Sequence, residues 1–160
     1  MTERARRGLK TLANPSDTAE LRRRLSHLSA DSARRWGRMT AHQMVCHLTD
    51  AFLMGTGQKP VSSARGWHNR TVVKWIALYV PVRWPAGIAT RPEVDQEIGG
   101  TKPGTFASDL AALDALLQRA ASEHEFFHGR PHPIFGPLSR GAWLRWGYLH
   151  VDHHLRQFGV

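Results

Sequence analysis

The sequence predicts an all-α protein, a four-helix bundle with a long crossover between its second and third helices. Two observations support this fold class: apolar residues recur at helical spacing in four segments, and no segment shows the alternating pattern of a strand. The chain has 160 residues, which suits one domain that buries a core without disulfides or zinc. We therefore expect a flexible basic arm over residues 1–12 and one helical domain over residues 13–160.

The first helix is expected within NPSDTAELRRRLSHL. Asp17 and Glu20 have the spacing of a capping box, in which a helix-start side chain and the third helical residue satisfy each other's backbone N–H groups. An apolar series then follows at helical spacing, formed by Leu21, Leu25 and Leu28.

The second helix has a clearer start in RMTAHQMVCHLTDAFLMG, where Thr40 and Gln43 form a T-x-x-Q capping box. Gly55 and Gly57 are expected to end it, because glycine accepts the left-handed conformation that closes many helices. The crossover of residues 58–103 is rich in proline and glycine, with one short helix expected around NRTVVKWIALYV.

The last two helices complete the bundle. Thr105 is the expected N-cap of the third, FASDLAALDALLQRAASE, and Ser139 that of the fourth, which Gly159 ends. Short connections favour antiparallel packing of helices one and two and of helices three and four, whereas the long crossover permits helices two and three to run parallel.

Composition narrows the classes of function. Cys46 is the only cysteine, so an internal disulfide and a cysteine-based zinc knuckle are excluded, and a cytoplasmic location is expected. The most apolar stretch, residues 72–89, contains Lys74 and Arg83 and is too interrupted to span a membrane.

Of the net charge of +9, residues 1–40 contribute most, with ten Lys and Arg against four Asp and Glu. A solvated basic face is the simpler interpretation, and a nucleic-acid-binding module is the alternative.

Histidines gather at the end of the fourth helix, in YLHVDHHLRQFGV. On a helical wheel His154 falls about 40° from His150, on the same inward face as Trp143, whereas His153 falls at the boundary of that face. Trp143 and Trp146 are candidates for the walls of a pocket beside His150. Two further H-x3-H pairs, within residues 124–132, are interrupted by Gly129 and Pro131, so a common helical face is not expected for them.

The second helix adds one inward histidine, His47, whereas His42 lies on its polar side. One histidine from one helix and two from another, at i and i+4, can form a three-nitrogen metal site inside a bundle, with coordination positions left open for water and substrate. The alternative is a core in which these histidines are satisfied by hydrogen bonds alone.

Four further residues are candidates for fixing the ligand imidazoles. Asp50 and Gln43 flank His47 on the wheel, and Gln157 lies one turn beyond His154; His153 is a candidate for the same role or for the surface. Cys46 is expected to pack away from the metal, because about 100° of helical rotation separates it from His47. Aromatic residues of the crossover are expected to cover the core, with a lid over the open metal face or a membrane-surface patch as the alternatives: Trp67, Trp75, Tyr79 and Trp84.

These segments resemble a branch of unknown function within the DinB/YfiT-like superfamily of metalloenzymes. The resemblance rests on MTAHQMVCHLTDAF, on HPIFGPLSRGAWLRWGYLHVDHHLRQFG and on parts of the crossover, and it covers roughly residues 12–160. It implies an up-down-down-up bundle with a divalent metal, zinc or nickel, on His47, His150 and His154. Characterised relatives include thiol-dependent S-transferases and an isomerase that use bacillithiol or mycothiol as the cosubstrate. The tail of this chain reads HHLRQ where other branches often read HRGQ, so the resemblance does not extend to the substrate contacts.

The resulting functional hypothesis is a metal-dependent enzyme that acts on a small molecule, as a thiol-dependent transferase or isomerase. A metal-dependent hydrolase is the close alternative, and a non-enzymatic basic module that binds nucleic acid is the distant one. A homodimer is compatible with the bundle, although no exposed heptad seam predicts it.

Overall fold

The computed structural model describes residues 8–64, 66, 71–127 and 129–160. This part of the chain is all-helical, as predicted, and its only β-pairing is an isolated bridge between His132 and Gly136. Its α-helices are α1 (Pro15–Leu25), α2 (Ala41–Thr56), α3 (Val72–Tyr79), α4 (Phe106–Ser122) and α5 (Arg140–Gln157), and a short 3-10 helix, η3, spans Pro92–Val94.

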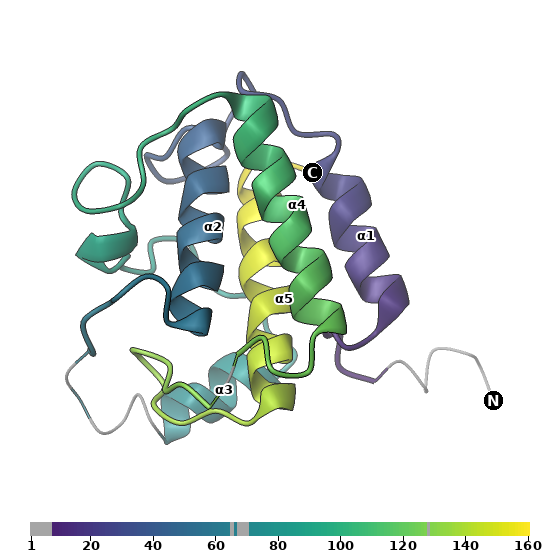
Figure 1. Cartoon of the computed structure of the whole chain (residues 1–160), viewed down its shortest axis with the longest axis vertical. Coiled ribbons are helices and arrows are strands. Elements are labelled where there is room, and N and C mark those ends of the chain that lie inside the picture. The colour runs from purple at the N-terminus through teal and green to yellow at the C-terminus, as the bar shows by residue number, and fades with distance from the viewer. Residues whose placement is uncertain (1–7, 65, 67–70, 128) are drawn as a thin grey trace.

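Figure 1 shows α1, α2, α4 and α5 side by side, with the shorter α3 near the beginning of α5. Helix α4 contacts α1 and α2, while α5 contacts α1, α2 and α3. The core between these helices is built from fully buried side chains that include Leu21, Met44, Phe52, Leu117, Leu144 and Leu155. The region between α2 and α4 carries α3 and η3, and η3 packs against α2.

Helix α1 begins earlier than its sequence pattern predicts. Its N-cap is Asn14, whose side chain accepts a hydrogen bond from the backbone N–H of Ser16, and Pro15 occupies the first helical position. Proline suits that position because its missing N–H would have no helical partner there. The expected capping box at Asp17 and Glu20 is therefore wrong, and Asp17 instead accepts a bond from the backbone N–H of Thr11 at 3.0 Å.

The starts of α2 and α5 follow the prediction. Thr40 and Gln43 form a complete capping box at α2, and the Ser139 hydroxyl accepts a hydrogen bond from the backbone N–H of Ala142 at α5. Gly57 ends α2 in the left-handed conformation. Gly55, however, lies inside α2, where an added Cβ would come within 2.7 Å of the Phe127 ring, so its small size serves packing instead of termination.

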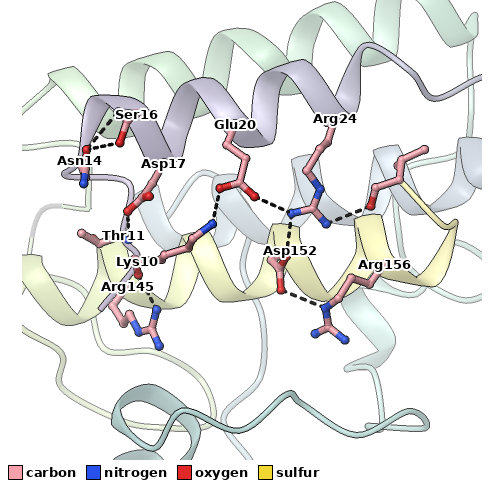
Figure 2. A network of polar contacts seen from close by, with 11 residues as sticks. Lys10, Thr11, Asn14, Ser16, Asp17, Glu20, Arg24, Arg145, Asp152 and Arg156 are labelled. Atoms are coloured by element: carbon pink, nitrogen blue, oxygen red, sulfur yellow. Dashed lines mark hydrogen bonds and ion pairs between the residues drawn. The ribbon is translucent and has the colours of Figure 1, made fainter. Parts of the chain in front are cut away.

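A network of charged side chains joins α1 to α5 (Figure 2). The Asp152 carboxylate accepts hydrogen bonds from Arg24 at 2.7 Å and from Arg156 at 3.0 Å, and Arg24 also donates to the carbonyl of Val160 at 3.0 Å. On another face of α1, Arg22 donates two bonds to Asp114 of α4. Two of the basic residues of the N-terminal segment 1–40, Arg22 and Arg24, thus stabilise helix packing.

Of the expected N-terminal arm, residues 1–7 lie outside the described residues. The rest contacts the bundle: Leu12 is buried in the core and its backbone N–H donates to the carbonyl of Leu144 at 3.2 Å. Trp75 and Tyr79 of α3 are exposed, and Trp67 lies outside the described residues. In the described part of the chain, no helix combines the length and the apolar character that crossing a membrane requires.

Candidate metal centre

His47 of α2 and His150 and His154 of α5 converge in the interior of the bundle. The Nε2 atoms of His47 and His150 are 3.2 Å apart, and the ring centroid of His154 lies 4.9 Å from that of His47 and 5.0 Å from that of His150. One nitrogen from each residue lies within 4.8 Å of the other two. His47 and His154 are buried and His150 is half-buried.

Hydrogen bonds orient two of these three rings. The Nδ1 of His47 lies 2.8 Å from the carbonyl oxygen of Val94 in η3, and since a carbonyl only accepts, Nδ1 carries the hydrogen. The Nδ1 of His154 lies 2.8 Å from Oε1 of Gln157, whose amide nitrogen donates to the carbonyl of Trp36 at 2.9 Å. Both Nε2 atoms are therefore left with lone pairs, the arrangement that metal-binding histidines require.

The surroundings keep all three imidazoles neutral. Burial lowers the pKa of His47, and it lowers the pKa values of His150 and His154 well below the usual range, with the neighbouring histidines adding to the effect. Neutral rings keep the lone pairs that bind a metal ion.

The geometry fits a divalent metal ion. Two nitrogens bound to a tetrahedral ion at about 2.0–2.1 Å stand about 3.3 Å apart, close to the 3.2 Å between His47 and His150. Nε2 of His150 thus faces the proposed ion, while its Nδ1 is buried without a hydrogen-bond partner among the described residues. The group could therefore bind a metal ion through three nitrogens, with positions left for other ligands.

The histidine cluster borders a cavity of about 540 Å³. Trp84 from the crossover and Trp146 from α5 form part of its wall, and the Trp84 ring lies 6.1 Å from the His150 ring. Most other lining side chains are apolar and come from α2, α3 and the crossover, among them Met54, Ile76 and Val94. A cavity of this size and character suits a small, mostly apolar molecule.

The two tryptophans of α5 have different positions. Trp146 lines the cavity, with its ring 4.9 Å from that of His150. Trp143 lies behind it in the core, stacked on Phe127 at 4.8 Å, with Nε1 donating to the carbonyl of Arg130. Only Trp146 occupies the wall position that the sequence suggested for both.

Three residues were expected to support the ligands besides Gln157, and they lie in different places. His153 is buried at the cavity wall, 6.0 Å from the Trp84 ring. Gln43 uses its side-chain oxygen to accept from the backbone N–H of Thr40. Asp50 is fully buried, but the hydrogen-bond partner of His47 is the Val94 carbonyl.

Asp50 instead ties α2 to the crossover beyond η3. Its carboxylate accepts bonds from Gln96 Nε2 at 3.0 Å and from the backbone N–H and the hydroxyl of Thr101 at 2.8 Å and 2.7 Å, and Lys59 lies 3.2 Å away. Because Val94 is two residues before Gln96, this carboxylate helps position the carbonyl that orients His47.

Replacing Asp50 with alanine should lower the free energy of unfolding by about 3 kcal/mol, since three donors and one cation lose a buried acceptor. Denaturant unfolding measures the change. Asp31→Ala is the matched control: Asp31 is exposed, and its loss should change stability by about 0.5 kcal/mol or less. A change below about 1 kcal/mol at Asp50 would contradict this role.

A second group of potential ligands comprises His42, Cys46 and Asp109, at the contact of α2 with α4. The Asp109 carboxylate accepts bonds from His42 at 2.7 Å and from the backbone N–H of Gly104 at 2.9 Å, and the Cys46 thiol points to it at 3.6 Å. Burial, aided by Asp109, raises the pKa of Cys46 to about 12, so the thiol stays protonated. These side chains satisfy one another, and Cys46 lies outside the three-histidine group, as expected.

Sequence reasoning missed His132. The interrupted histidine pairs of residues 124–132 gave no helical face, and His128 lies outside the described residues, but His132 is buried and lines the cavity. The available signal was the local sequence HPIFG, a tight turn that places its histidine next to the α5 helix.

Comparison with models of known protein families gives a match over most of the chain. The model of a family described as "Protein of unknown function (DUF1569)" matches residues 9–159. The searches of curated proteins and of solved structures found no match.

Proposed function

The chain belongs to the DUF1569 family of unknown function, and we propose from its site that it is a metal-dependent enzyme acting on an apolar small molecule. One observation carries the proposal: three histidine side chains converge beside a cavity of about 540 Å³ with mostly apolar walls. Metal ligands next to a ligand-sized cavity are typical of catalytic sites, because the positions left free on the ion face the substrate.

The proposal includes a DinB/YfiT-like architecture. The contacts of α4 with α1 and α2, and of α5 with the same two helices, support a four-helix bundle in the up-down-down-up order that the resemblance implies. In such a bundle the second and fourth long helices supply one and two histidines, as α2 and α5 do here.

The proposed cofactor is a divalent ion, zinc or nickel, held by His47, His150 and His154. When bound, it would act as a Lewis acid that lowers the pKa of a thiol or a water molecule. The protein's own contribution is positional: Val94 and Gln157 orient two ligand rings, while Trp84 and Trp146 supply apolar wall beside them.

The proposed reaction class is thiol-dependent transfer or isomerisation. The only protein thiol, Cys46, lies outside the cavity wall and stays protonated, so a sulfur nucleophile has to come from a small cosubstrate. The proposed setting is the reducing cytoplasm, where a chain with a single cysteine needs no disulfide.

Turnover should require both metal and thiol. We expect zinc- or nickel-loaded protein to accelerate the reaction of bacillithiol or mycothiol with the apolar electrophile 1-chloro-2,4-dinitrobenzene, measured by chloride release. His150→Ala should abolish the acceleration, whereas His42→Ala should retain it.

Each alternative has its own outcome. Metal-dependent cleavage of 4-nitrophenyl esters without thiol would instead assign a hydrolase. A failure of metal to accelerate either reaction would contradict the proposed enzyme.

A further inference from the structure

The turn HPIFG holds the His132 side chain in one position. His132 and Gly136 exchange two backbone hydrogen bonds of 2.8 Å, and Gly136 adopts a φ of 67°, in the left-handed region that favours glycine. Within the turn, the Nδ1 of His132 lies 3.1 Å from the backbone nitrogen of Ile134 and 3.2 Å from that of Phe135.

These bonds determine the tautomer of His132. Backbone N–H groups only donate, so Nδ1 carries a lone pair and the hydrogen of the neutral ring is on Nε2. The ring stacks on Phe135 at 4.8 Å and lies 4.9 Å from the Trp146 ring. Burial lowers the pKa of His132 to about 3, so the ring stays neutral around neutral pH.

The Nε2–H of His132 is an unused donor. His132 is 4% exposed, and its Nε2 is buried without a hydrogen-bond partner in the described part of the chain. The residue lines the cavity that also borders the three histidines. A buried donor without an acceptor is unfavourable, and a ligand that supplies the acceptor removes that cost.

We propose that His132 is a substrate-binding residue that donates its Nε2–H to a carbonyl-type oxygen on an apolar substrate in this cavity. The inference rests on the proposed function in one respect, that this cavity is the substrate site. Among the described lining residues, the charged side chains are Arg83 and Arg91, and no carboxylate is present. This electrostatic character disfavours a cationic substrate and agrees with an oxygen acceptor.

The tautomer can be measured directly by ¹⁵N NMR of the histidine rings in metal-free protein. We expect His132 to show an unprotonated Nδ1 and a protonated Nε2 from pH 5.5 to 8. The opposite tautomer, or a titration within this range, would overturn the proposal. This measurement does not depend on metal binding or on turnover.

Binding is tested with two probes of similar shape, acetophenone, which has a carbonyl oxygen, and α-methylstyrene, which has a methylene group instead. The variant is His132→Asn, whose side-chain oxygen can still accept from the turn's backbone N–H groups. In NMR titrations of metal-free protein, the variant should bind acetophenone about tenfold more weakly than the wild type and bind α-methylstyrene equally well.

The other outcomes are equally informative. Equal losses of affinity for the two probes would show that His132 only shapes the cavity, and would overturn the proposal. Failure of the wild type to bind either probe would overturn it as well. Because both titrations use metal-free protein, either failure is distinguishable from a failure of the metal-dependent activity.

Discussion

Purified, tag-free protein is expected to carry about one divalent metal ion per chain and to lose it when His47, His150 or His154 is replaced with alanine. The reason is geometric: the three nitrogens converge within 4.8 Å, so removing one leaves two ligands and a gap beside an apolar cavity. Mass spectrometry of the metal content measures the occupancy, which should fall below about a tenth of an ion per chain in each variant.

His42→Ala is the matched control because His42 belongs to the second group of potential ligands, with Cys46 and Asp109. The metal should remain in this variant. Loss of metal in the control, with retention in the three histidine variants, would move the metal site to the contact of α2 with α4. No metal in the wild type, even after reconstitution with zinc or nickel, would make the three histidines a polar core.

The second large effect concerns acid stability of the metal-free protein. Five buried or half-buried histidines have pKa values lowered chiefly by burial: His47, His132, His150, His153 and His154. In the unfolded chain a histidine takes up a proton near pH 6.5. Below that pH the unfolded state therefore binds more protons than the native state, and the free energy of unfolding falls as the pH falls.

The decrease approaches about 1.4 kcal/mol per pH unit below pH 6.5 for each histidine that stays neutral, and amounts to about 1.2 kcal/mol per such histidine between pH 7 and pH 5.5, so several of them together separate the two pH values by several kcal/mol. The Asp152 carboxylate does not offset the decrease in this window: partial burial raises the pKa of Asp152, but the hydrogen bonds from Arg24 and Arg156 lower it on balance. Denaturant unfolding at several pH values, with a chelator present, measures the slope.

Two variants identify the residues responsible for that slope. His150→Gln should reduce the slope of the unfolding free energy against pH by the contribution of about one bound proton. His124→Gln replaces an exposed ring and should leave that slope unchanged. Stability of the metal-free protein that is independent of pH between 7 and 5.5 would contradict the neutral state of the cluster.

Much of the candidate site could be predicted from the sequence because the direction in which side chains point repeats regularly along a helix. Residues four apart on α5 share a face, so His150 and His154 point the same way, and Gln157 follows three residues after His154. The same reasoning placed His47 on the inner face of α2 and separated it from Cys46. The capping signals of Thr40 and Ser139 are equally local, which is why those helix starts were predicted correctly.

Features that depend on contacts between different elements were not predicted correctly. Helix α1 starts at the Asn14 cap and Pro15, whereas the Asp17 carboxylate accepts a hydrogen bond from the backbone N–H of Thr11, a contact that helical spacing does not encode. Gly55 was expected to end α2, as glycine often does. The contact with Phe127 that explains a glycine inside the helix exists only in the packed structure. Trp143 and Trp146 share a helix face, yet Phe127 and the Arg130 carbonyl hold the first of them in the core.

The sequence by itself determined the helical class and the inward positions of His47, His150 and His154, since both depend on spacing along single helices. Only the tertiary structure decided which atoms surround them. The Val94 carbonyl and the His132 donor lie outside the long helices and far along the chain from His47, and Asp50 of α2 has its hydrogen-bond partners, Gln96 and Thr101, in the crossover. Chain folding brings these groups together, so their roles follow from packing and hydrogen bonding between elements.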